Sequence, residues 1–249
     1  MADRVPADLH VHTALSPCAN DDMCPPAVLL TAEQRGLAVL GVVDHNTAGN
    51  APAFLEAATA FALRVFVGLE VESAEGVHVL VLFDTAEAAA DMDAAVAAHL
   101  PALRNDATLF GNQLLVDAFG KPLASEERLL LTATSLSLEQ IATMAAERGG
   151  MTILAHIDRQ PYGLLPVLGF VPPGLRFEVV EVSRHTTFDA ARTRWPELET
   201  LPLITSSDAH CLDDIGAAVT WVSSPLAEAE LSARDWGRRL AAELLAPGG

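Results

Sequence analysis

The chain has 249 residues, and 51% of them are hydrophobic, which excludes a disordered protein and suits one large α/β domain or two small ones. Its formal net charge of -18 repels nucleic-acid backbones, so no long nucleic acid is expected as partner, whereas a small phosphorylated molecule is compatible with this charge if metals supply local positive charge. The sequence contains no apolar run of membrane length and no signal-peptide pattern at MADRVPADLH, which predicts a cytoplasmic protein without a membrane partner.

Short β-branched runs alternate with alanine-rich runs along the chain. The expected strands span residues 7–12, 38–45, 64–71, 77–83, 151–156, 177–183, 202–208 and 218–223. The expected helices span residues 25–36, 50–63, 85–99, 138–149, 188–199 and 226–245. Ser137 followed by Gln140 has the spacing of a capping box, which marks the start of one helix.

This alternation predicts a mostly parallel sheet with helices outside, and seven or eight such units favour a barrel over an open sheet. Two segments break the alternation. Residues 73–76 are too few for a helical crossover, so the strands on either side should form an antiparallel hairpin with position 71 opposite position 78. Residues 100–137 form an insertion, in which a small hairpin turns at Gly120 and Lys121. With no linker or repeat, residues 1–249 are expected to form a single domain.

Two pairs of side chains have the spacing of a metal chelate on a strand. His10 and His12 are two residues apart, so both point to the same face, and Asp208 and His210 repeat this spacing. Each pair is equally compatible with a polar strand face or a turn.

Glu70 follows a strongly apolar run, where an unpaired carboxylate is costly, so it should meet a cation. The predicted hairpin places it diagonal to His78, within reach of a shared ion. Asp44 with His45, and His156 later in the chain, stand at the ends of two further strands, where α/β folds place ligands.

The joint pattern is more informative than any single residue. Six of the eight histidines fall at strand ends, whereas His99 and His185 do not. With Glu70 and Asp208, these six supply eight N or O ligands, which is too many for one tetrahedral ion and suits two or three ions. The eight residues are His10, His12, His45, Glu70, His78, His156, Asp208 and His210.

The segments DLHVHT, VVDHN, GLEVES, VHVL, LAH and SSDAH resemble, in order, the motifs of the PHP (polymerase and histidinol phosphatase) family over residues 7–216. The resemblance implies a distorted (β/α)7 TIM-like barrel. It also implies two or three manganese, iron or zinc ions at the carboxyl ends of the strands. Many members cleave phosphate monoesters, and others serve DNA polymerases. The stretch SPCANDDM further resembles a subgroup of short bacterial PHP phosphoesterase-like proteins.

The resemblance also implies roles for individual residues. One metal would be held by His10, His12, Asp208 and Glu70. Glu70 would bridge to a second metal, held by His78 and His156. A third metal would be held by His45 and His210. Cys18 is either a thiolate ligand or a small side chain in a turn. Asp8 and Asp44 are expected to orient imidazoles from outside the ligand set.

The expected reaction is phosphate-ester hydrolysis by a metal-bridging hydroxide. Arg159 and Arg184 are candidates for holding the phosphoryl group, and each is equally compatible with a surface charge. His185 is a candidate for protonating the leaving group and is equally compatible with a position outside the ligand set. An amidohydrolase-like enzyme is an alternative, disfavoured because Lys121, the only lysine, lies in the insertion. A non-catalytic, metal-binding regulatory module is another, and phosphate release from simple esters separates the first function from both.

Overall fold

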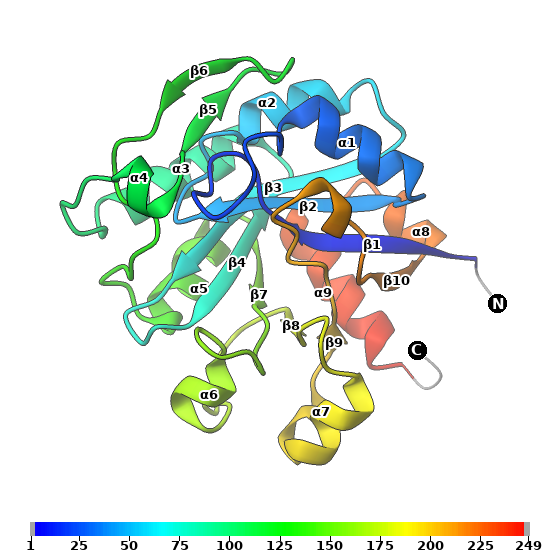
Figure 1. Ribbon diagram of the computed structural model, residues 1–249. Coiled ribbons are helices and arrows are strands. Elements are labelled where there is room, and N and C mark those ends of the chain that lie inside the picture. Colours follow the sequence, from blue (N-terminus) through cyan, green and yellow to red (C-terminus); the bar gives the residue numbers. More distant parts are fainter. Residues whose placement is uncertain (1–2, 247–249) are drawn as a thin grey trace.

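A computed structural model describes residues 3–246, and its main sheet curls into a nearly closed barrel in the order β10-β1-β2-β3-β4-β7-β8-β9 (Figure 1). Its strands are β1 (Arg4–Val11), β2 (Val39–His45), β3 (Arg64–Glu72), β4 (His78–Phe83), β7 (Met151–Leu154), β8 (Val179–Glu181), β9 (Leu203–Ile204) and β10 (Thr220–Ser223). This is the distorted TIM-like barrel that the sequence predicts. The described chain has eight strands in this sheet, where the family resemblance implied seven.

Strand direction decides which residues reach the functional rim of the barrel. The pairs β1–β2, β2–β3, β7–β8 and β8–β9 are parallel, whereas β10–β1, β3–β4 and β4–β7 are antiparallel. The carboxyl ends of the parallel strands therefore share one rim, where antiparallel β4 presents its first residue, His78. Ala209 closes this rim, because it bridges to Val11 and accepts a 2.9 Å hydrogen bond from the backbone N–H of His12.

The β3–β4 hairpin forms as predicted, but its predicted register is wrong by one residue. Glu72 lies opposite His78, and Val71 opposite Val79. The backbone N–H of Ser73 still pairs with Val77, so the loop has three residues and ends at Gly76 with a φ of 76°. The shift matters, because residues of one strand alternate between faces. Only the observed register puts Glu70 and His78 on the same face.

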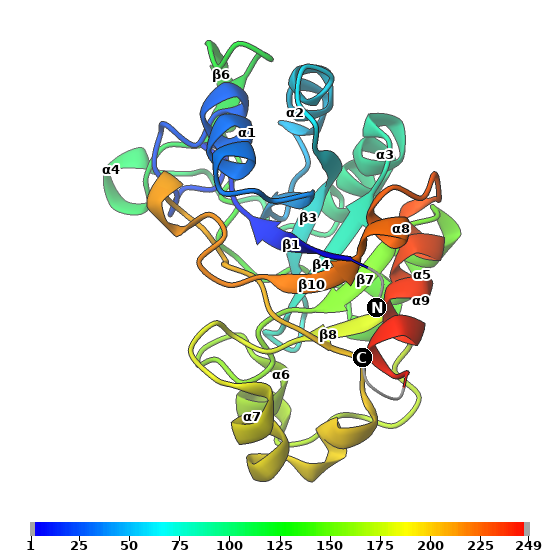
Figure 2. The same ribbon diagram turned by 90° about the vertical axis from the view of Figure 1, so that its right-hand side faces the viewer.

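Helices cover the outside of the barrel, and Figure 2 shows α1, α2 and α3 side by side there. The helices are α1 (Pro25–Gln34), α2 (Ala51–Ala58), α3 (Ala86–Ala97), α4 (Ala107–Phe110), α5 (Leu138–Glu147), α6 (Leu164–Leu168), α7 (Phe188–Arg194), α8 (Ser224–Ala227) and α9 (Ala233–Leu244). The capping box at Ser137 and Gln140 is confirmed. The helix predicted over 188–199 instead ends at Arg194 and continues as a 3-10 turn from Pro196, because proline has no N–H to extend an α-helix.

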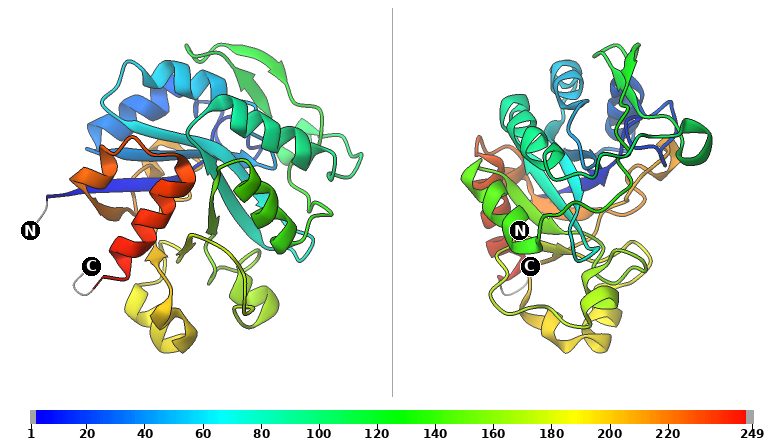
Figure 3. Two further views of the ribbon diagram at one scale, coloured as in Figure 1. Left: turned by 180° about the vertical axis from the view of Figure 1, so that it is seen from behind. Right: turned by 90° about the vertical axis from the view of Figure 1, so that its left-hand side faces the viewer.

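Helix α9 closes the end of the barrel opposite the histidine-bearing rim. In the left view of Figure 3 it crosses in front of the strands, on the side that faces away in Figure 1. Trp236 is fully buried there, with its ring centroid 5.1 Å from that of Phe66 near the start of β3. A Cβ atom at Gly237 would lie 2.6 Å from the side chain of Met151, so the absence of a side chain lets α9 approach β7 closely.

The insertion at residues 100–137 contains α4 and a separate hairpin of β5 (Leu114–Val116) and β6 (Pro122–Ser125). Gly120 lies in its turn with a φ of 80°, so the predicted small hairpin is confirmed. Asn46, directly after β2, donates 2.8 Å hydrogen bonds to the carbonyl oxygens of Leu130 and Thr132. The insertion is thereby fixed to the functional rim.

No helix within residues 3–246 is both long enough and apolar enough to cross a membrane.

Candidate metal centre

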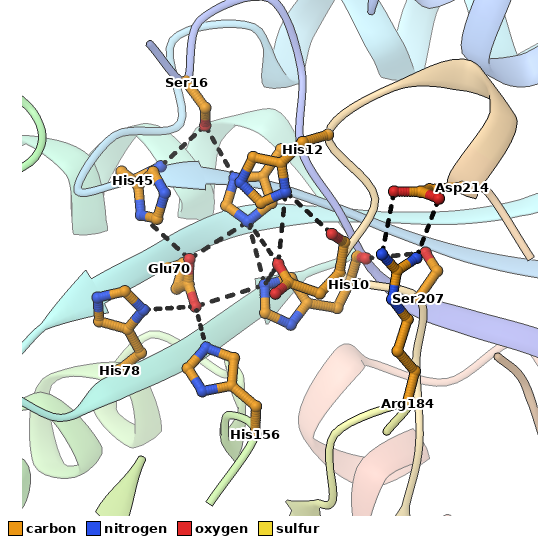
Figure 4. A network of polar contacts seen from close by, with 12 residues as sticks. His10, His12, Ser16, His45, Glu70, His78, His156, Arg184, Ser207 and Asp214 are labelled. Atoms are coloured by element: carbon orange, nitrogen blue, oxygen red, sulfur yellow. Dashed lines mark hydrogen bonds and ion pairs between the residues drawn. The ribbon is translucent and has the colours of Figure 1, made fainter. Parts of the chain in front are cut away.

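The strands bring all eight predicted ligand residues to one place at the open rim of the barrel. Figure 4 labels the six that are buried. His10 lies on β1 and His12 directly follows it, His45 ends β2, Glu70 lies near the end of β3, and His78 begins β4. The other three follow β7 and β9: His156, Asp208 and His210. All except Asp208 and His210 are buried, and those two are partly buried.

Glu70 is the centre of this cluster, because five imidazoles contact its two carboxylate oxygens. The contacts to Oε1 are His78 Nδ1 at 2.8 Å, His156 Nε2 at 3.1 Å and His10 Nε2 at 3.4 Å. The contacts to Oε2 are His45 Nδ1 at 3.1 Å and His12 Nε2 at 3.2 Å. A single buried carboxylate is thus surrounded by nitrogen donors.

Asp208 forms a second focus beside the first. Its Oδ1 lies 3.4 Å from Nε2 of both His10 and His12 and 3.6 Å from Nδ1 of His210. Its Oδ2 contacts the guanidinium of Arg159. Since His10 and His12 reach both carboxylates, Glu70 and Asp208 belong to one connected site.

Hydrogen bonds outside the cluster select the free nitrogen of two imidazoles. Nδ1 of His10 donates to Glu181, 3.2 Å from Oε1. Ser16 Oγ gives its one proton to Asp44 Oδ1 at 2.6 Å, so it accepts from Nδ1 of His12 at 2.9 Å. In both histidines Nε2 is therefore the nitrogen that faces the cluster, and it binds a metal once it has lost its proton.

Charge within the site is balanced by protons on histidines. Burial lowers the pKa of His10, but the carboxylates of Glu181, Asp208 and Glu70 raise it well above its usual value. Burial also lowers the pKa of His12, but hydrogen bonds to Asp208 and Glu70 raise it to about 9. Burial raises the pKa of Glu70, but the surrounding imidazoles hold it well below its usual range. The ionised carboxylates thus demand buried positive charge.

In each of three groups of side chains, the possible ligand atoms lie within 4.8 Å of one another, and His12 and His45 each belong to two groups. The groups are His12 with His45 and His210, His10 with His12 and Asp208, and His45 with Glu70 and His78. Imidazole nitrogens and carboxylate oxygens at this spacing fit zinc, manganese or iron. Burial keeps the pKa of His78 at about 4 and that of His210 at about 3, so both are neutral and able to ligate.

Backbone strain is concentrated at the same place. Within residues 3–246, four non-glycine residues have a positive φ: Asn46 at 54°, His156 at 26°, Tyr162 at 73° and Asp208 at 51°. Two of them belong to the cluster, and Asn46 directly follows His45. Such conformations cost about 1–3 kcal/mol each and typically persist at functional sites. The fold therefore accepts strain to form this rim.

The three candidates for substrate binding line one cavity of about 250 Å³ beside the cluster. Arg159, Arg184 and His185 share it with His156 and Asp208. Both guanidiniums already have acidic partners, because Arg159 pairs with Asp208, and Arg184 lies 3.1 Å from Asp214.

Two predicted outer residues behave differently from expectation. Asp8 does not orient an imidazole, because its oxygens accept the backbone N–H groups of Ser207 at 3.0 Å and Gly216 at 2.8 Å. Asp44 acts on His12 only through Ser16. Among the described residues, Cys18 belongs to none of the three ligand groups, and its side chain is exposed.

The sequence analysis missed Glu181 and Ser16. Glu181 stands in the apolar strand FEVVEVS, and the argument that marked Glu70 applies equally to this buried carboxylate. Ser16 carries no such signal, because a serine four residues after a histidine is common in any turn.

Comparison with known proteins agrees with this geometry. The PHP domain model matches residues 8–159, more than half of the chain, and the PHP-associated model matches residues 194–233. The first match contains His10, His12, His45, Glu70, His78 and His156. No curated protein matches the sequence.

Several solved structures share the fold. The lesion-specific endonuclease EndoQ of Pyrococcus furiosus aligns with a TM-score of 0.60 at 19% identity, over 86% of this chain and 51% of its own, so this chain spans about half of that protein. A protein of Bifidobacterium adolescentis designated a metal-dependent phosphoesterase aligns with a TM-score of 0.56 at 17% identity, over 99% of both chains. An amidohydrolase of Chromobacterium violaceum, with bound sulfate and no metal, aligns with a TM-score of 0.59 at 21% identity, over 95% of this chain and 96% of its own.

At sequence identities of 17–21%, the solved structures establish only the fold of this chain, whereas the match to the PHP domain model establishes its family. The chain belongs to the PHP family.

Proposed function

We propose that this protein is a phosphoesterase that hydrolyses a small phosphate ester, nucleotides included. The observation that carries the proposal is the convergence of five imidazoles on the buried carboxylate of Glu70, with Asp208 beside it. Multinuclear metal sites of N and O ligands are suited to phosphoryl transfer, where charge develops on several oxygens at once.

We assign the ligands by the contacts within the cluster. His10, His12 and Asp208 would hold one ion, and Glu70 would hold another together with His78 and His156, which both contact its Oε1. His45 and His210 contribute to a third position together with His12. When bound, the ions polarise the phosphoryl oxygens and lower the pKa of a water molecule.

The chain's own residues then position the substrate. Arg159 and Arg184 line the cavity beside the cluster, and a guanidinium binds two phosphoryl oxygens at once. His185 lies in the same cavity and is our candidate proton donor to the leaving group. The modest cavity of about 250 Å³ favours a small ester.

A nuclease is the second candidate, because endonuclease Q shares this fold and was solved with a 27-mer duplex carrying an abasic lesion at its active site. The net charge of -18 opposes duplex binding, and this chain covers only 50% of the endonuclease chain in that complex. The amidohydrolase-like alternative has a neighbour of the same fold in the Chromobacterium violaceum protein, but Lys121, the only lysine of the chain, lies in the hairpin turn of the insertion. Phosphate release separates the phosphoesterase from a regulatory module.

The decisive experiment measures metal content and phosphate release together. Protein purified without chelator or His tag should contain about two or three metal equivalents by plasma mass spectrometry, and after loading with manganese, iron or zinc it should release phosphate from monoesters. Glu70→Ala and His156→Ala should lose both properties. His99→Ala is the matched control, because His99 lies outside the cluster and its side chain bonds to the hydroxyl of Ser135.

Metal-loaded protein that cleaves a duplex with an abasic site but no small ester would transfer the assignment to the nuclease. Loaded protein that cleaves neither would refute the phosphoesterase proposal.

A further inference from the structure

The two arginines and the histidine beside the cluster stand on two different connections. Arg159 belongs to the connection after β7, whereas Arg184 and His185 belong to the one after β8. All three line the same cavity of about 250 Å³. A guanidinium holds a phosphoryl group well only when its distance and direction are fixed, so the two connections have to keep a constant spacing.

The carboxylate of Asp158 joins these two connections. Its Oδ1 accepts a 2.7 Å hydrogen bond from the backbone N–H of Ser183, and its Oδ2 accepts a 2.8 Å hydrogen bond from the hydroxyl of the same serine. Asp158 directly precedes Arg159, and Ser183 directly precedes Arg184. Since Ser183 is buried, water competes little for either bond. One side chain thus links the backbone positions next to both guanidiniums.

Backbone hydrogen bonds fix both ends of this link. On the first connection, the N–H of Ile157 bonds to the carbonyl oxygen of Glu181 at 2.9 Å, which places Asp158 beside the end of β8. On the second, the N–H of Thr186 bonds to the carbonyl oxygen of Ser183 at 3.1 Å, which closes a turn around two central residues. These central residues are Arg184 and His185. The carboxylate therefore anchors the start of the turn that carries two of the three cavity groups.

Asp158 holds the chain at the point where it leaves the sheet. The N–H of Val182 still bonds to β9, 2.9 Å from the carbonyl oxygen of Ile204. The next N–H, that of Ser183, points instead to Asp158. Helix α7 begins only at Phe188, and the residues between carry no regular structure. Without this carboxylate, the turn would keep its place in the chain but lose its attachment to the neighbouring connection.

We propose that Asp158 is a positioning residue, which holds Arg184 and His185 toward the phosphoryl group without touching the substrate. This inference rests on the proposed function. Asp158 is not among the described residues that line the cavity, so its effect passes through the turn. The nearest predicted metal ligand along the chain, His156, has its backbone N–H held by Glu181 instead, at 3.0 Å. Loss of the Asp158 carboxylate therefore weakens the binding of a phosphoryl group and leaves the metal ions in place.

The test measures the binding of inorganic phosphate to metal-loaded protein by calorimetry, so it does not depend on turnover. Metal content is determined on the same samples. Asp158→Ala should bind phosphate about tenfold more weakly than wild-type protein, the effect of losing one hydrogen bond to a charged group, and should keep its metal.

Two variants serve as controls. Asp158→Asn should stay within about twofold of wild-type protein, because its amide oxygen can accept from the N–H of Ser183 while its amide nitrogen donates to the hydroxyl. Glu243→Ala should leave phosphate binding unchanged. Glu243 makes the same pair of contacts, with the N–H and the hydroxyl of Ser223 at 2.8 Å and 2.7 Å, but Ser223 lies opposite Arg4 at the start of β1, away from the rim.

A double-mutant cycle separates positioning from a general effect on the fold. In a chain that already carries Arg184→Ala and His185→Ala, Asp158→Ala should cause no further loss of phosphate affinity, because the groups that it positions are gone. If circular dichroism shows that Asp158→Ala does not fold, Ser183→Ala takes its place. It removes only the 2.8 Å bond and should weaken phosphate binding about threefold, again only while Arg184 and His185 are present.

Equal phosphate affinity in Asp158→Ala and wild-type protein overturns the proposal. A loss that is just as large in the chain without Arg184 and His185 overturns it too, as does a loss of metal together with phosphate, which would assign Asp158 to the support of His156. Failure of the proposed function is distinguishable, because there phosphate binding still depends on Asp158 while no phosphate ester is hydrolysed.

Discussion

Glu181→Gln tests how the fold prepares a ligand for metal. Glu181 is buried and accepts hydrogen bonds from Nδ1 of His10, at 3.2 Å and 3.3 Å, and from the backbone N–H of His156 at 3.0 Å. Glutamine keeps the size and one oxygen. With that oxygen in the place of Oε1 it can still accept from both His156 and His10, but the amide nitrogen then stands in the place of Oε2, 3.3 Å from Nδ1 of His10, where two N–H donors oppose each other.

The conflict is relieved when His10 carries its proton on Nε2 instead. That nitrogen lies 3.4 Å from oxygens of both Glu70 and Asp208, so protonating it removes the lone pair that a metal needs. Loss of such an orienting partner typically weakens metal binding 10- to 100-fold, which is about 1.4–2.8 kcal/mol. We expect this loss without a change in the coordinates of the barrel.

The assay is calorimetric titration of chelator-treated protein with manganese or zinc, alongside circular dichroism to confirm folding. Glu178→Gln is the matched control, because Glu178 also accepts hydrogen bonds from a backbone N–H and a hydroxyl, both of Thr152, but lies outside the cluster. Equal metal affinity in Glu181→Gln and wild-type protein would show that His10 does not need this carboxylate, and the tautomer argument would be wrong.

Three further predictions concern the residues around the cluster and the opposite end of the barrel. Ser16→Ala removes the hydroxyl between Asp44 and His12, so metal affinity should fall at least about tenfold in the same titration, and Ser16→Thr should restore it. Because the pKa of His12 is about 9 in the metal-free protein, metal binding at pH 7 should release protons, which is measured as a binding enthalpy that depends on the buffer. For the same reason the affinity for metal should rise from pH 6 to pH 9. Trp236→Ala should lower the free energy of unfolding in urea by about 3–5 kcal/mol while the folded protein keeps its metal content, because Trp236 packs at the far end of the barrel.

The ligand set was predictable because strand geometry and burial leave few options. His10 and His12 share a face by spacing alone, and Glu70 after an apolar run has to meet positive charge. The strand ends then bring these residues to one rim, whatever the exact strand lengths. The predicted strands 177–183 and 202–208 were too long, since the structure limits β8 to Val179–Glu181 and β9 to Leu203–Ile204. The composition of the rim does not depend on this difference in length.

The contacts around the ligands were less predictable, because they depend on long-range packing. Asp8 reaches Ser207 and Gly216 across about 200 positions of sequence, and no local pattern shows whether it will meet an imidazole or an amide. The hairpin register depended on a single residue, since closing the turn at Ser73 and Val77 rather than one position earlier reverses the face of His78.

The net charge of the whole chain and the charges at the rim have different effects on an approaching anion. A net charge of -18 repels a polyanion at long range, yet interactions between exposed charges are screened beyond about 10 Å. A small anion that reaches the rim meets Arg159, Arg184 and His185 in one cavity, and metal ions bound by Glu70 and Asp208 would add further positive charge. The acidic surface would therefore oppose long nucleic acids, while the two guanidiniums and bound metal ions would attract compact phosphate esters, which is the selectivity that the proposed function requires.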